Sequence, residues 1–247
     1  EKRGFSFDPE ELFELINENT SLLIINSPAN PTGGLIGKNT IEKLVEKLEK
    51  FPNLCILSDE IYSQILYDKK FYSMLNFESI RNRLIILDGW SKTYAMTGWR
   101  IGYGIWPQNI VDKAIRLNVN SVSCTNAPTQ YAAIAALKGP QNKVDNMVQE
   151  FDTRRDLIVK NTNSIPGFSC LKPEGAFYVM PNITKTGLNS KEIEQILLEE
   201  LKVASVAGTS FGSYGEGYIR LSYANSQKNI VEALERIHKY AVEKNWG

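Results

Sequence analysis

The sequence predicts an α/β fold in two parts. The first is a three-layer αβα large domain with a mainly parallel sheet, only partly contained in this chain; the second is a smaller α+β carboxyl-terminal domain. The chain has 247 residues, 43% of them hydrophobic, which is enough for a substantial core. As far as Pro140, short apolar runs alternate with stretches of helical period. From Gln141, helices and short strands alternate, so we place the domains at residues 1–140 and 141–247.

The elements of the first part follow from apolar runs that are bounded by turn residues. The candidate strands are residues 22–26, 54–58, 84–88 and 100–105. A crossover helix is predicted over residues 40–50, where apolar side chains recur at helical spacing: Ile41, Leu44, Val45 and Leu48. Another helix is predicted over residues 127–138, because the Gly139-Pro140 pair that follows cannot continue it.

The second part begins with a long polar helix that is predicted to run from Gln141 to about Asn163. Strands are expected at residues 168–171, 176–180, 203–207 and 218–223. Helices are expected at residues 190–201 and 227–243. No long linker separates the two parts, so we expect an extensive interface between the domains.

Composition excludes several classes of function. Lysine and arginine number 28, as do aspartate and glutamate, so we expect no nucleic-acid or membrane partner. The longest apolar run, residues 131–137, is far shorter than the roughly 20 residues that span a bilayer. With no signal segment at its start, the chain is expected to be soluble and cytoplasmic. The single histidine, His238, and three scattered cysteines argue against a metal site, a Ser-His-Asp triad and a disulfide framework.

Polar residues follow the ends of three predicted parallel strands, where open α/β sheets bind ligands. Asn30 follows the first strand, Asp59 and Tyr62 the second, and Lys92 the third. Taken singly, Lys92 could be a solvated lysine, Asp59 a helix N-cap and Asn30 a turn residue. Their shared position at one edge of a sheet favours a site.

Four motifs occur in a consistent order along the chain. They are Asn30-Pro31-Thr32-Gly33, Asp59-x-x-Tyr62, the stretch Ser91-Lys92-Thr93-Tyr94-Ala95-Met96-Thr97-Gly98-Trp99-Arg100-Ile101-Gly102, and Tyr218-Ile219-Arg220-Leu221-Ser222. In these motifs, and over essentially its whole length, the chain resembles the fold-type I pyridoxal-phosphate aminotransferases of class I/II. Residues 172–178 resemble the subgroup that contains bacterial aspartate aminotransferases.

The resemblance implies that pyridoxal 5'-phosphate is the cofactor. Lys92 would form the Schiff base and shuttle protons, which suits a lysine amine. Asp59 would keep the ring nitrogen of the cofactor protonated. Tyr62 and Asn30 would donate to the ring oxygen.

The remaining predicted contacts concern the phosphate group and the substrate. Arg100 and Ser91 would hold the phosphate, although many relatives place that hydroxyl earlier, where this chain has Gly89 and Trp90. Arg220, on one face of an alternating strand, would bind the α-carboxylate of the substrate, assisted by Asn30.

The resemblance implies a homodimeric enzyme that transfers an amino group between an L-amino acid, aspartate as the first choice, and a 2-oxo acid. Aromatic and alanine-type donors stay open. A C-S lyase or cyclopropane-forming synthase of the same fold is an alternative, as is a non-catalytic effector domain of a transcription regulator.

Relatives of this kind have a long segment before the point at which this chain begins. We therefore expect an inactive carboxyl-terminal piece with apolar surface and a sheet edge uncovered. We also expect at least one cis bond in Ser27-Pro28-Ala29-Asn30-Pro31, with Asn30-Pro31 as the first choice, to aim Asn30 at the cofactor.

Overall fold

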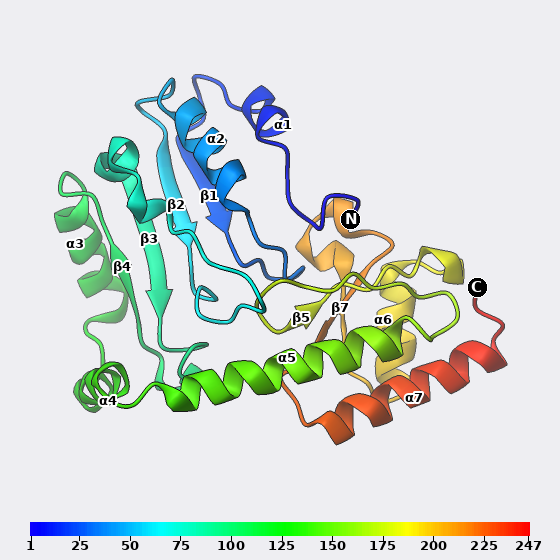
Figure 1. Ribbon diagram of the computed structural model, residues 1–247. Helices are drawn as coiled ribbons and strands as arrows, with labels where there is room; N and C mark the ends of the chain where they lie inside the picture. Colours follow the sequence, from blue (N-terminus) through cyan, green and yellow to red (C-terminus); the bar gives the residue numbers. More distant parts are fainter. The chain divides into compact units, whose positions relative to one another are not determined.

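A computed structural model describes the whole chain, residues 1–247, as two compact units (Figure 1). The sheet unit comprises Ser6–Pro28 and Leu35–Asp145. The carboxyl-terminal unit comprises Glu1–Phe5, Ala29–Gly34 and Asn146–Gly247. Two short early segments thus belong with the end of the chain, and the domain division at residue 141 remains a prediction.

The sheet unit contains a mixed four-stranded sheet in the order β1-β2-β3-β4. Its strands are β1 (Leu22–Asn26), β2 (Cys55–Asp59), β3 (Leu84–Gly89) and β4 (Gly102–Ile105). The first three are parallel, whereas β4 runs antiparallel to β3. The predicted α/β class is confirmed. Because β1, β2 and β3 are parallel, their carboxyl ends lie at one edge of the sheet.

Helix α2 (Lys38–Leu48) lies against β1 and β2 and contributes its buried side chains to the main core of the sheet unit (Figure 1). Its four predicted apolar residues are all buried and pack with Ile25, Ile56 and Ile86 of the strands. Each buried side chain of this size contributes about 1.5–3 kcal/mol of transfer free energy. A short helix that was not predicted, α1 (Pro9–Glu14), contacts α2 and is capped by Asp8, whose side chain accepts from the N–H of Glu10.

Two further helices follow β4 in the chain. Helix α4 (Ala127–Lys138) has the predicted bounds, but α3 (Val111–Val122) was missed. None of the residues of α3 is buried, and several of its apolar side chains are exposed: Ile115, Leu117, Val119 and Val122. The edge strand β4 exposes Tyr103 and Ile105. The expected uncovered apolar surface and sheet edge are therefore present.

The carboxyl-terminal unit contains an antiparallel sheet in the order β5-β7-β6. Its strands are β5 (Tyr178–Val179), β6 (Val206–Ala207) and β7 (Ile219–Ser222). All three are shorter than predicted. The predicted strand at residues 168–171 is wrong, because only an isolated bridge between Ser169 and Asn182 forms there.

Three helices accompany this sheet. Helix α5 (Asn142–Thr162) begins in the sheet unit and continues into the carboxyl-terminal unit. Helices α6 (Ser190–Glu199) and α7 (Gln227–Glu243) occur where they were predicted. Along the whole chain, no helix combines the length and the apolar character needed to cross a bilayer.

Candidate functional site

Three of the predicted residues come together at the carboxyl ends of β2 and β3. Asp59 is the last residue of β2 and pairs with Leu87 of β3, so the segments that follow the two strands leave the sheet side by side. Tyr62 follows Asp59 and is only 3% exposed. The Nζ atom of Lys92, which follows β3, lies 5.8 Å from the centroid of the Tyr62 ring.

The carboxylate of Asp59 is half-buried and short of hydrogen-bond donors. Burial raises its pKa, while the N–H of Ile61, 3.2 Å from Oδ1, and the positive charge of Lys92 lower it. A carboxylate of this kind is costly to ionise until a cationic partner approaches it. Asp59 is therefore suited to a ligand that presents a protonated nitrogen.

Glu60, which sequence analysis did not single out, holds the segment after Asp59 in place. Its Oε1 atom accepts from the hydroxyls of Ser58 (3.1 Å) and Ser73 (3.0 Å) and from the N–H of Met74 (3.2 Å). Burial raises the pKa of this carboxyl, and the three donors partly offset that effect. The acid thus ties residues 73–74 to the end of β2.

We expect Glu60→Ala to lower the free energy of unfolding by about 2–4 kcal/mol, because the Met74 N–H loses its acceptor in a buried place. The melting temperature should fall by about 5–15 °C in thermal unfolding followed by circular dichroism. Glu60→Gln retains an oxygen acceptor and should lose less. Equal stability of the alanine variant and the parent would contradict this role.

The same carboxyl makes stability depend on pH. Because its folded pKa lies above the unfolded value, its contribution to stability is complete below the unfolded pKa and is lost as pH rises through the folded pKa. Glu60→Gln should flatten that dependence.

A second pair that was not predicted flanks this cluster. Asp88 of β3 lies opposite Tyr103 of β4 and accepts from its hydroxyl (3.2 Å) and from the N–H of Gly89 (2.6 Å). Burial raises the pKa of Asp88, and the nearby charge of Asp59 raises it further. Partial burial of the half-exposed Tyr103 side chain, together with Asp88, raises the pKa of Tyr103 to about 12. Only the cross-strand register reveals this pair.

The two residues predicted to hold the phosphate, Ser91 and Arg100, lie on either side of Lys92 in the chain. A Cβ at Gly89 would lie 2.7 Å from the Cα of Gly102, so no side-chain hydroxyl fits there and Ser91 is the nearest candidate before Lys92. Arg100 has a left-handed backbone (φ 54°), and its Nη1 donates to the Thr97 carbonyl at 3.0 Å. It lines a cavity of about 810 Å³.

Arg220 and Asn30 are far apart in the sequence, but they contact each other within the carboxyl-terminal unit. Nη1 of Arg220 donates to Oδ1 of Asn30 at 2.8 Å. The Ser27-Pro28 and Asn30-Pro31 bonds are both cis, which confirms the expected cis bond. Gly33 fixes the same segment, because its carbonyl accepts from the N–H groups of Glu174 and Gly175, each at 3.0 Å.

The two groups of residues offer complementary chemistry. The sheet unit holds an amine, a carboxylate and a phenol, which can anchor an aldehyde and pair with a cationic ring nitrogen. The carboxyl-terminal unit holds a guanidinium and an amide, which can bind a carboxylate. Each group lies within its own unit.

A family model described as aminotransferase class I and II matches residues 1–237. The chain belongs to the class I and II aminotransferases. This aminotransferase chain is similar to the aspartate aminotransferase of Pyrococcus abyssi, with 40% identity over 99% of the chain. It is also similar to the aromatic-amino-acid aminotransferase 2 of Thermococcus litoralis, with 39% identity over 99% of the chain. The chain spans 63% of the length of each relative.

Solved structures agree with this assignment. The aromatic aminotransferase from Pyrococcus horikoshii OT3 superimposes with a TM-score of 0.95 at 37% identity, covering 100% of this chain and 66% of the other. The aspartate aminotransferase from Rhizobium meliloti gives a TM-score of 0.92 at 34% identity, covering 98% of this chain and 63% of the other. The fold of an aminotransferase thus extends over nearly every residue of this chain.

Proposed function

We propose that the protein is an aminotransferase that uses pyridoxal 5'-phosphate to transfer an amino group between an L-amino acid and a 2-oxo acid. The observation that carries this proposal is the convergence of Lys92, Asp59 and Tyr62 at the carboxyl ends of two parallel strands. Family membership supports the same reaction.

The residues of the sheet unit fit this cofactor. Asp59 is half-buried and has a raised pKa, as expected for a carboxylate that awaits a protonated ring nitrogen. Lys92 would anchor the cofactor covalently, and Tyr62, with Asn30, would donate to its ring oxygen. Ser91 and Arg100 would supply donors and positive charge to the phosphate.

Pyridoxal phosphate, when bound, supplies an aldehyde that condenses with amines and a ring that withdraws electrons. Lys92 Nζ would accept the proton that leaves Cα of the donor amino acid in one half of the exchange, and would give a proton to Cα of the 2-oxo acid in the other half. The charge of Asp59 would keep a proton on the ring nitrogen. Arg220 would hold the α-carboxylate, so that Cα is oriented for proton transfer.

Aspartate with 2-oxoglutarate is our first proposal for the substrates. Relatives named for aspartate and for aromatic amino acids match this chain almost equally, at 40% and 39% identity. Competition between aspartate and phenylalanine as donors, measured as kcat/KM, would decide between the two. A preference for phenylalanine would overturn the aspartate proposal and leave amino transfer intact.

We further propose a cytoplasmic homodimer. The exposed apolar residues of α3 support association, because Ile115, Val119 and Val122 share one side of the helix by spacing and would be shielded from water by a second copy. Sedimentation equilibrium of the protein would test the dimer, and a single species at monomer mass would contradict it.

Reductive trapping at Lys92 is the test of the proposed function. The protein is loaded with one equivalent of pyridoxal phosphate, reduced with borohydride and digested, and the pyridoxyl peptide is identified by mass spectrometry. We expect the label on Lys92, and Lys113→Ala, at an exposed position on α3, should leave it unchanged. Label on another lysine while Lys92 stays unmodified would refute the assignment.

Product analysis separates the alternatives that share this cofactor. An aminotransferase converts the donor to its 2-oxo acid and the acceptor to an amino acid, whereas a C-S lyase releases a thiol and ammonia. In the whole protein, cofactor binding at Lys92 without turnover of any donor would favour an effector-binding role instead.

A further inference from the structure

Two aromatic rings lie beside the guanidinium of Arg220. The Cζ atom of Arg220 is 4.6 Å from the centroid of the Tyr178 ring and 5.1 Å from that of Phe211. Tyr178 belongs to β5, and Phe211 follows β6 in the chain, so the rings come from the strands on either side of β7. Both distances are within the range of cation–π attraction.

Phe211 is not a core residue. Its side chain is 41% exposed, whereas Tyr178 is buried at 8%. Its ring therefore lies at the surface over Arg220 instead of in the core, where the cation–π contact is its identified interaction. The Arg220 guanidinium contacts these two rings and the amide oxygen of Asn30, and none of the three is a carboxylate. The charge of Arg220 therefore remains available to an anionic ligand.

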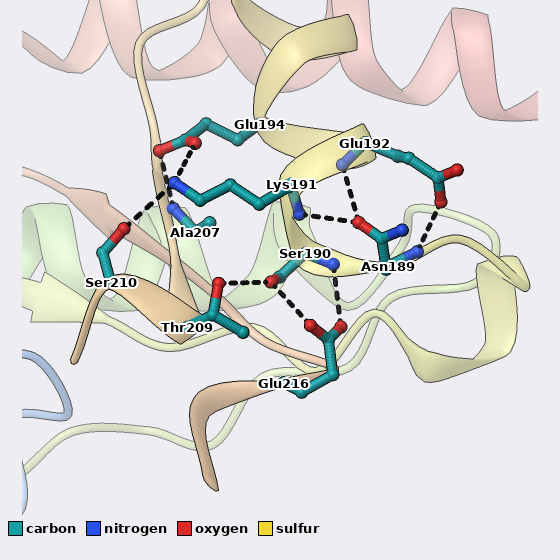
Figure 2. Close-up of polar contacts among 9 residues, drawn as sticks. All are labelled: Asn189, Ser190, Lys191, Glu192, Glu194, Ala207, Thr209, Ser210 and Glu216. Carbon is teal, nitrogen blue, oxygen red and sulfur yellow. Dashed lines mark hydrogen bonds and ion pairs between the residues drawn. The ribbon is translucent and has the colours of Figure 1, made fainter. Parts of the chain in front are cut away.

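The loop that carries Phe211, residues 208–217, is anchored to the start of α6 (Figure 2). The carboxylate of Glu216 accepts from the N–H of Ser190 at 2.8 Å and from its hydroxyl at 3.0 Å. The N–H of Gly217 also donates to Glu216, at 2.8 Å. These donors hold the pKa of Glu216 below its usual value, so the anchor is charged at neutral pH.

A second set of contacts joins α6 to Ala207, which precedes the loop, and to Ser210, which lies within it (Figure 2). Glu194 of α6 accepts from the N–H of Ala207 at 2.8 Å, and Lys191 donates to the hydroxyl of Ser210 at 3.1 Å. Lys191 and Glu194 also pair with each other at 2.8 Å. Ser210 is the neighbour of Phe211, so this contact fixes the backbone that presents the ring.

Close backbone packing gives the loop a defined shape. A Cβ at Gly208 would lie 1.9 Å from the carbonyl oxygen of Gly215, and a Cβ at Gly215 would lie 2.0 Å from that of Gly208. Only glycine fits at either position. The loop therefore folds back on itself between Gly208 and Gly215, and Phe211 lies within that turn of the chain.

We propose that Phe211 is a positioning residue, whose ring, together with that of Tyr178, fixes the guanidinium of Arg220 for carboxylate binding. The inference rests on the proposed role of Arg220. A bidentate grip requires the planar guanidinium to keep one orientation, and an arginine side chain otherwise samples many rotamers. The two rings limit that freedom before the ligand arrives, which strengthens binding by preorganisation.

The test measures binding of succinate, an unreactive carboxylate, to the cofactor-loaded protein by calorimetry. Phe211→Ala should weaken binding by about 3- to 30-fold, and Phe211→Tyr, which keeps a ring, should restore it to within about twofold. The KM for the amino donor should rise in parallel, with a smaller change in kcat. Tyr214→Ala, in the same loop but 100% exposed, is the matched control and should behave as the parent.

Two outcomes distinguish a failure of the proposed role of Arg220 from a failure of the positioning role of Phe211. If Arg220→Lys leaves succinate binding unchanged, the proposed role of Arg220 fails. If Arg220→Lys weakens binding but Phe211→Ala does not, Arg220 keeps its role and the positioning proposal alone is overturned. Thermal unfolding of Phe211→Ala, expected to match the parent because the residue is exposed, shows whether a loss of binding reflects local positioning.

Discussion

Lys92→Ala is expected to reduce the rate of amino transfer by at least about a thousandfold. The substitution removes both the amine that anchors the cofactor and the group that moves the proton at Cα, and general acid–base catalysis alone contributes about 10²–10⁴. The position supports this expectation, because Nζ lies beside the Tyr62 ring and interacts with the charge of Asp59. The measurement is single-turnover conversion of a donor amino acid by the cofactor-loaded whole protein, since residues 1–247 alone are expected to be inactive.

The control for this variant is Lys113→Ala, which removes an exposed lysine from α3 of the same unit. It should retain full activity. Adding a small primary amine to Lys92→Ala should restore part of the lost rate, since the proton acceptor can then come from solution. Full activity of Lys92→Ala without any added amine would show that another residue carries the chemistry.

Arg220→Ala should lower kcat/KM for the amino donor by about 100-fold or more. Loss of one partner of a charged, hydrogen-bonded pair costs about 2–5 kcal/mol, and here the carboxylate of the substrate would lose both its charge partner and its geometric guide. Arg220→Lys should restore only part of the loss, because an ammonium cannot bind a carboxylate through a planar fork. Steady-state kinetics with varied donor concentration measures both effects.

Cofactor loading provides the internal control for Arg220. The residues proposed to hold the cofactor covalently and at its ring nitrogen, Lys92 and Asp59, belong to the sheet unit, whereas Arg220 belongs to the carboxyl-terminal unit. Reductive labelling of Lys92 should therefore be normal in Arg220→Ala. Arg236→Ala, on the exposed surface of α7, serves as the matched substitution and should leave kcat/KM unchanged.

The parts of the fold that the sequence predicts are those with local signals. The apolar spacing of Ile41, Leu44 and Val45 predicts α2, and these residues are buried as expected. The signals at Asp59 and Lys92 were also local, because each polar residue follows a short apolar run, and the parallel order of β2 and β3 brings them together. For the same reason, α4 and α7 have their predicted bounds.

The features that the sequence did not predict are of two kinds. Some depend on contacts between residues far apart in the sequence, and one is a helix that has no buried residue. Helix α3 was not predicted, and it buries none of its residues in this chain. The pairing of Asp88 with Tyr103 requires the antiparallel register of β3 and β4. Phe211 has significance only because β6 pairs with β7 and so brings its loop near Arg220. None of these relations is visible in a window of neighbouring residues.

The six-residue segment Ala29–Gly34 has a consequence for how the polypeptide acquires its structure. The carbonyl of Gly33 accepts from the N–H groups of Glu174 and Gly175. The carboxyl-terminal unit is therefore complete only after this early stretch of the chain has packed against it. A polypeptide that starts at residue 146 would leave those two amides without their acceptor. Loop closure over such a separation is slow, so maturation of this unit should trail that of α2 and its strands. Residues 146–247 alone are therefore not a complete module, and gene fusions or swaps between relatives should exchange Ala29–Gly34 together with the carboxyl-terminal unit.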